Sequence, residues 1–239
     1  MQDRVRLLGV LVDAVSTDAA SDAAIKYIEE ENTRVVYLVN SETLILLEKN
    51  DEGKALLGAC DMVLPGTVSV STGIDDVLGL KRDPFFLESY FDNIFEYAVA
   101  NGKEMQLIAG SEEQFQSVKE NIHEKWSYLT LSGAYFTEQE PSYEHIVNEI
   151  NSIAPDILIL ALNESIQLQL LKEYRNQMNA GLMIFTGNIL YNKAVSEAKL
   201  PETVEKLRIG NLYKWLRKDS SGKNLFNNIR MKFRLRRDK

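Results

Sequence analysis

The chain has 239 residues, of which 45% are hydrophobic and 26% are charged, and its net charge is −8. This composition is typical of a globular protein and excludes a disordered chain or a collagen-like repeat. A single cysteine, Cys60, and two histidines, His123 and His145, exclude an internal disulfide framework, a cysteine-only zinc site and a histidine-rich metal centre.

The first 16 residues contain a short apolar patch that is interrupted by Asp13. This segment is too short and too charged for a signal peptide, and no run of 18 apolar residues follows it. We therefore expect a cytoplasmic protein that is soluble or peripheral at the inner face of the cell membrane.

Short aliphatic segments then alternate with longer amphipathic ones. Strands are predicted over residues 34–39, 62–64, 105–109, 128–131, 156–161 and 182–185. Helices are predicted over residues 18–31, 42–58, 69–79, 85–101, 111–126, 139–153 and 164–179. The strand over 156–161 is apolar on both faces, as in a parallel strand that is covered by helices on each side. The alternation predicts an α/β fold with an open, mostly parallel sheet.

The alternation stops near Pro201, where the composition becomes basic. Residues 199–239 hold 13 basic and four acidic residues, a net charge of +9, so residues 1–198 carry −17. We expect a core domain over 1–198 and a helical, basic appendage over 199–239, with helices at 201–217 and 223–236. A basic segment after an acidic body indicates an anionic partner.

The end of this appendage combines apolar and cationic side chains. Positions 225, 226, 229 and 233 are apolar and share one side of a helix. The cations beside them are Arg230, Lys232, Arg234, Arg236 and Arg237. This pattern favours contact with an anionic membrane surface, where each cation contributes about 1 kcal/mol. Packing on the protein's own core is the alternative. Nucleic acid is disfavoured because the acidic body repels phosphate.

Familiar catalytic motifs are absent from the sequence. It has no P-loop, no dinucleotide fingerprint, no nucleophile elbow and no D-x-D pair for holding a metal against a nucleotide diphosphate. The adjacent pair Asp75–Asp76 is interpreted as a solvated helix surface. We therefore predict no metal site and no cofactor.

Three segments that follow predicted strands are candidates for a ligand site. They begin at Asn40, at Pro65 and at Asn163, and they include Glu42, Thr67, Glu164 and Gln167. The segment 65-PGTVSVSTG-73 offers backbone amides and hydroxyls that suit a phosphate. Ligands of open α/β sheets bind beyond the carboxyl ends of the strands, where all three segments lie.

The order of several short motifs resembles the WecG/TagA/CpsF glycosyltransferases over roughly residues 8–217. The matching features are Val35–Asn40 with Ser41-Glu42, Cys60–Pro65, Ala98 with Asn101-Gly102, Gly110, 133-GAYF-136, 158-LILAL-162 with Gln167, Gly187, Pro201 and 212-LYKW-215. The resemblance rests on the order and spacing of these motifs along the chain.

The resemblance implies a Rossmann-like core without a metal site. It also implies transfer of an N-acetylhexosamine from a UDP-sugar to an undecaprenyl-diphosphate-linked acceptor, in teichoic acid or surface polysaccharide synthesis. An arginine-rich C-terminal appendage would meet the membrane and the diphosphate, which agrees with the charge distribution. Substrate-binding residues carried over from the family are Asn40, Thr67, Gln167 and Gly187.

The chain departs from the family pattern at several polar positions. Gly66 occupies the position of the aspartate proposed as the catalytic base. Further replacements in the pattern are Leu38, Ser89, Leu168 and Leu190. Because a positioned general base contributes about 10²–10⁴-fold to a rate, these changes favour a catalytically impaired protein.

Three interpretations follow. In the first, the chain is a silent family member, or pseudoenzyme, that acts as a binding subunit or as a partner in a homo- or hetero-oligomer with another glycosyltransferase. In the second, it is an active transferase with a rebuilt site in which Glu42 or Glu164 replaces the missing acid. In the third, it is an α/β nucleotide-binding regulator unrelated to glycan synthesis.

Overall fold

The computed structural model describes residues 4–30, 32–79, 83, 85–135 and 142–190. Within them lies a sheet of six parallel strands in the order β4-β3-β8-β7-β5-β6. The strands are β3 (Arg34–Val39), β4 (Met62–Pro65), β5 (Met105–Ala109), β6 (Ser132–Tyr135), β7 (Ile157–Ala161) and β8 (Leu182–Phe185). The predicted α/β, Rossmann-like fold with a parallel sheet is confirmed.

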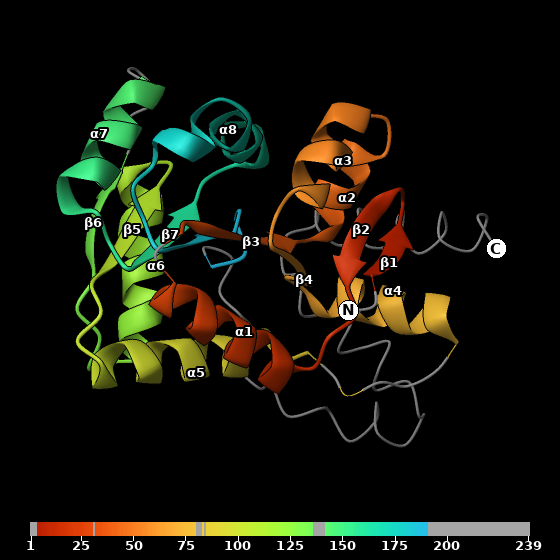
Figure 1. Cartoon of the computed structure of the whole chain (residues 1–239), viewed down its shortest axis with the longest axis horizontal. Helices are drawn as coiled ribbons and strands as arrows, with labels where there is room; N and C mark the ends of the chain where they lie inside the picture. The colour runs from red at the N-terminus through yellow and green to blue at the C-terminus, as the bar shows by residue number, and fades with distance from the viewer. Residues whose placement is uncertain (1–3, 31, 80–82, 84, 136–141, 191–239) are drawn as a thin grey trace.

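Helices cover both faces of this sheet (Figure 1). The face that packs against β3 through Val36 and Leu38 is covered by α1 (Thr17–Glu29), α5 (Leu87–Ala100) and α6 (Glu112–Lys125). The opposite face is covered by α2 (Ser41–Leu47), α3 (Asp51–Gly58), α7 (Tyr143–Ile153) and α8 (Glu164–Gln169), whereas α4 (Val68–Leu78) packs beside the edge strand β4. The central strands β7 and β8 are buried along their whole length, as their continuous aliphatic sequences predict.

An N-terminal hairpin was not predicted from the sequence. Strands β1 (Arg4–Leu7) and β2 (Val10–Asp13) pair antiparallel around Leu8 and Gly9, which both have positive φ angles, as in the favoured two-residue hairpin turn. Leu-Gly is a weaker turn signal than Asn-Gly, so the sequence pattern of residues 4–13 did not indicate two strands. The hairpin lies beyond β4 in Figure 1.

The side chain of Asp13 joins this hairpin to the sheet. It is fully buried, and its two oxygens accept hydrogen bonds from Arg4 Nε at 2.9 Å and from the backbone N–H of Val63 at 2.7 Å. The second bond satisfies a donor on the outer edge of β4. The hairpin therefore covers one edge of the parallel sheet.

Three other boundaries differ from the prediction. The strand predicted over 128–131 is wrong, because a turn from Trp126 to Leu129 follows α6 and the strand β6 begins only at Ser132. The helix predicted over 42–58 is two helices, since Asn50 caps the start of α3. The helix predicted over 164–179 is α8 followed by a π-helical turn, Leu170–Tyr174, and a 3₁₀ turn, Arg175–Gln177.

Candidate functional site

The order of the strands brings three post-strand segments together. Strand β8 lies between β3 and β7, so the residues after β3, β7 and β8 meet at the carboxyl edge of the sheet. These residues are Asn40, Glu164 and Gly187. All three segments expected from the sequence lie at this edge, because β4 pairs in parallel with β3. Gly187, which was named from the family resemblance, joins them there.

Asn40 joins the segments that follow β3 and β7. Its side-chain oxygen accepts a hydrogen bond from the Thr43 backbone N–H at 2.8 Å, so Asn40 caps the start of α2. Its amide group donates to Glu164 Oε1 at 3.2 Å. The Thr43 hydroxyl lies 3.1 Å from the Asn40 oxygen and 3.5 Å from the same Glu164 oxygen.

Glu164 is a buried carboxyl group, with 6% of the residue exposed. Burial raises the pKa of Glu164 above its ordinary value, and the negative charge of Glu42 acts in the same direction. Hydrogen bonds to the carboxylate, including those from Asn40 and Thr43, partly offset this shift. A carboxylate with a raised pKa is a better proton acceptor near neutral pH, and it also accepts hydrogen bonds from ligand hydroxyls.

Gln167 links α8 to the turn after β8. It is fully buried, and its side-chain oxygen accepts a hydrogen bond from the Gly187 N–H at 3.0 Å. Its amide group donates to the Tyr37 hydroxyl at 3.4 Å, and Tyr37 stacks on Phe185 at 5.6 Å between ring centroids. Both polar ends of Gln167 are therefore bonded within the protein, so this side chain holds the site in shape.

The third expected segment, at the end of β4, has a different environment. The Gly66 N–H donates to the Val39 carbonyl at 2.7 Å, and a Cβ atom built at Gly66 would collide with the end of the Ile189 side chain. Thr67 lies at the start of α4, where its hydroxyl bonds to Ser69 at 2.9 Å. The space beside Gly66 is thus occupied by an aliphatic side chain.

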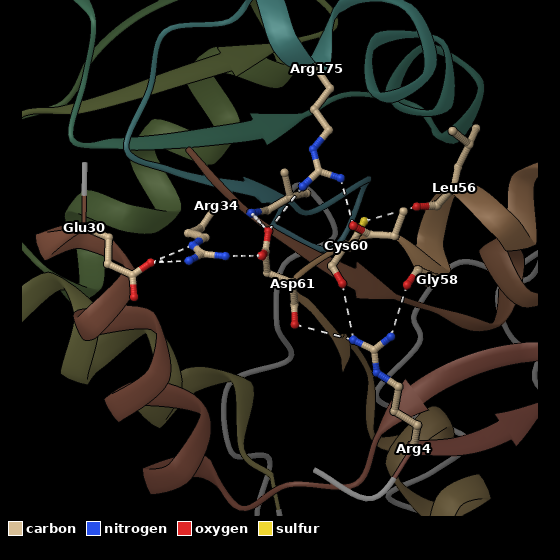
Figure 2. A network of polar contacts seen from close by, with 10 residues as sticks. Arg4, Glu30, Arg34, Leu56, Gly58, Cys60, Asp61 and Arg175 are labelled. Atoms are coloured by element: carbon tan, nitrogen blue, oxygen red, sulfur yellow. Dashed lines mark hydrogen bonds and ion pairs between the residues drawn. The ribbon is translucent and has the colours of Figure 1, made fainter. Parts of the chain in front are cut away.

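A second polar network lies at the opposite, amino edge of the sheet (Figure 2). Asp61 accepts hydrogen bonds from Arg34 Nη1 at 2.9 Å and from the Val35 N–H at 2.8 Å, and it pairs with Arg175 at 3.4 Å. Asp61 belongs to the matched Cys60–Pro65 segment, and its contacts lie at the opposite end of the strands from Glu164. An open depression of about 470 Å³ beside Arg175 is lined by Asn32, Thr33, Arg175, Asn176 and Met178.

Sequence reasoning did not identify Thr43, Tyr37 or Ile189 as members of the site. Thr43 had a readable signal, since it stands three residues after Asn40, at the position where a cap receives its hydrogen bond. Tyr37 and Ile189 gave no such signal, because their roles depend on contacts with residues far along the chain.

The remaining candidates are placed as follows. Glu42 lies in the first turn of α2, and Cys60 is buried. The predicted membrane-contact residues Arg230, Arg234, Arg236 and Arg237, the whole appendage over 199–239 and its two predicted helices fall outside the described residues. In the described part of the chain, no helix is both long and apolar enough to span a bilayer. The same residues contain no cluster of three or more His, Cys, Asp or Glu side chains suited to a metal ion.

Comparison with protein families assigns the chain. The model of the glycosyl transferase WecG/TagA/CpsF family matches residues 5–238. The chain belongs to this family. The match covers nearly the whole chain and extends through the basic segment at its end. No curated protein matches the sequence. The family connects the fold to sugar transfer.

Proposed function

We propose that this WecG/TagA/CpsF-family protein binds a UDP-N-acetylhexosamine at the carboxyl edge of its sheet and that the chain alone transfers the sugar poorly or not at all. Its role would be that of a binding or partner subunit in cell-surface polysaccharide or teichoic acid assembly. Another glycosyltransferase would supply the missing acid in a hetero-oligomer.

One observation carries this proposal. Gly66 lacks a side chain at the position of the family's proposed base, and Ile189 fills the adjacent space. An aliphatic group in that place cannot accept the proton of an acceptor hydroxyl. The family's fold and the polar contacts of Asn40, Glu164 and Gly187 support retention of a ligand site.

A second candidate is an active transferase in which Glu164 is the base. It is favoured by the burial and raised pKa of Glu164 at the carboxyl edge. In that reaction the acceptor oxygen attacks the anomeric carbon, Glu164 takes the proton of the hydroxyl, and the bond from the anomeric carbon to the diphosphate breaks to release UDP. The alternative base is Glu42, whose negative charge contributes to the raised pKa of Glu164.

The first test is the thermal shift of the full chain with UDP-N-acetylhexosamines. At ligand concentrations about 100 times Kd, binding adds about 2.7 kcal/mol, which raises Tm by roughly 5–10 °C for a chain of this length. The second test is transfer to a lipid-linked acceptor by the wild type and by Glu164→Gln and Glu42→Gln.

Binding without turnover is the result expected from our proposal. Turnover that Glu164→Gln abolishes would overturn it in favour of the active transferase. A wild type that neither binds nor transfers would contradict both candidates and would direct the search to protein partners.

For the appendage, we propose that residues 199–239 bring the core to an anionic membrane at the inner face of the cell membrane and that the arginines near the chain end contact lipid diphosphate. This rests on the segment's net charge of +9 and on its apolar positions. Sedimentation with vesicles that contain anionic lipid should fall when residues 223–239 are deleted. Unchanged binding of the deleted chain would contradict the proposal.

A further inference from the structure

We propose that Arg175 and Asp61, at the amino edge of the sheet, are positioning residues for the contact between Asn40 and Glu164 at the carboxyl edge. The inference rests on the proposed function in that this contact lies in the proposed ligand site. It concerns how the fold holds two halves of that site together.

Asp61 fixes the beginning of β3. Its Oδ2 atom accepts a hydrogen bond from the Val35 N–H at 2.8 Å, and its Oδ1 atom accepts one from Arg34 Nη1 at 2.9 Å. The guanidinium of Arg34 also bonds to Glu30, which holds it in place. From this anchor β3 runs to Val39, and the next residue is Asn40. Together with the pairing of β3 to β4 and β8, this anchor sets where the strand ends at Asn40.

Arg175 fixes the far end of the helical segment that begins at Glu164. Its Nη1 atom donates to the Ala59 carbonyl at 2.8 Å, and its Nη2 atom lies 3.4 Å from Asp61 Oδ2 (Figure 2). Between Glu164 and Arg175 the chain continues without a break from α8 into the π-helical turn Leu170–Tyr174. Few helices contain a π-helical turn, and those that do often have it at a functional site.

The two anchors close a ring. Asp61 holds β3, β3 carries Asn40, Asn40 bonds to Glu164, the helix from Glu164 carries Arg175, and Arg175 returns to Asp61. Contiguous hydrogen bonds and rigid elements are the kind of structure through which two sites can be coupled energetically. Without the Arg175 contacts the helical segment would keep its packing through Leu170 and Leu171 and its Gln167–Tyr37 bond, but its far end would lose the polar link to Ala59 and Asp61.

The same helical segment offers a matched control. Lys172 pairs with Glu52 of α3 at 2.9 Å, and both side chains are well exposed. Replacing Lys172 removes a cation three residues from Arg175 without touching the ring. A conservative variant, Arg175→Lys, keeps the charge at the position and is the milder change.

The experiment compares Arg175→Met, Arg175→Lys and Lys172→Met in the full chain. The first measurement is amide exchange at residues 40–47 and 163–169, where Asn40 and Asn163 cap the helices. Amide exchange in the first turn of α6, which Ser111 caps, serves as an internal reference for a general loss of stability. The second measurement is the Kd of UDP.

We expect Arg175→Met to increase exchange at 40–47 and 163–169 relative to the α6 reference and to weaken UDP binding by about 2- to 30-fold, the range seen for residues within coupling networks. Arg175→Lys should give a smaller effect in the same direction, and Lys172→Met should give none.

Equal increases in exchange at 40–47, at 163–169 and at the start of α6 in Arg175→Met would overturn the positioning role. Exchange at 40–47 and 163–169 that stays unchanged relative to α6 would overturn it as well. If the wild type binds no UDP, the ligand assigned in the proposed function fails, and the exchange measurement still decides the positioning role. If Arg175→Met does not fold, the exchange pattern of Arg175→Lys decides it.

Discussion

Gly187 approaches Glu164 so closely that a Cβ atom at residue 187 would lie 3.0 Å from Glu164 Oε1. The backbone of Gly187 also has a φ angle of 58°, a left-handed conformation that L side chains rarely adopt. The turn after β8 can therefore reach the carboxyl group and Gln167 only because it has no side chain there.

Replacing Gly187 with alanine tests this close approach. Gly187→Ala should lose about 1–2 kcal/mol from the left-handed backbone and should also weaken ligand binding, because the methyl group displaces Glu164. Gly79→Ala is the control, since Gly79 has a φ angle of 67° and open space around it. Thermal melts with and without UDP-N-acetylhexosamine compare the two. Identical ligand shifts in both variants would refute a role for the approach of Gly187 to Glu164.

The second prediction concerns the pH dependence of stability at Glu164. Because burial raises the pKa of Glu164 in the folded state, the fold favours the protonated carboxyl. Its stabilising contribution is therefore complete below the ordinary pKa of 4.5 and is lost as the pH rises through the folded-state pKa.

The Tm of the wild type relative to Glu164→Gln should accordingly rise as the pH is lowered from 7.5 toward 4. Melts of both proteins across this range measure the difference. Glu120→Gln, an exposed substitution on α6, is the control. A difference between wild type and Glu164→Gln that stays constant over the range would argue against a raised pKa.

Cys60 should be inert in the native protein. Burial raises the pKa of its thiol to about 12, and 4% of the residue is exposed. Since the thiolate is the reactive form, thiol reagents at pH 8 should label the folded chain very slowly and the urea-unfolded chain rapidly. Time courses by mass spectrometry measure both rates. Fast, complete labelling of the folded protein would show that Cys60 is accessible.

The buried carboxylate of Asp13 should matter more for stability than exposed ion pairs. Asp13→Asn leaves Arg4 without its charged partner and weakens the link to Val63, so we expect a loss of about 1.5–3 kcal/mol. Asp51→Asn breaks the pair of Asp51 with Lys54, where the Asp51 side chain is 97% exposed, and should leave Tm nearly unchanged. Urea unfolding of both variants measures the contrast. Similar losses in the two would contradict it.

The sequence was sufficient to predict the parallel sheet, because buried strands such as Ile157–Ala161 are continuous aliphatic runs. It was not sufficient for β1 and β2, whose apolar run is divided by a Leu-Gly turn and whose burial depends on Asp13 reaching Val63. Strand β6 was placed too early because the turn after Trp126 is held by a local backbone hydrogen bond that hydropathy does not reveal.

The candidate site was predictable in its members and less so in its contacts. Asn40, Glu164 and Gln167 follow strands, so the topology rule places them at one edge of the sheet. The pairing of Asn40 with Glu164 spans 124 residues, and the filling of the space at Gly66 by Ile189 depends on side-chain packing. Such long-range contacts are set by the completed fold.

The position of β8 also has a consequence for how the chain folds during synthesis. This strand is the last of the six in sequence, and it alone joins the β4-β3 pair to the β7-β5-β6 group. A nascent chain that ends before Leu182 would therefore hold two separate half-sheets, with one side of β3 and one side of β7 unpaired. Folding should be late and slow, since the closing contacts are distant in sequence, and incomplete chains should be prone to aggregate through those strands.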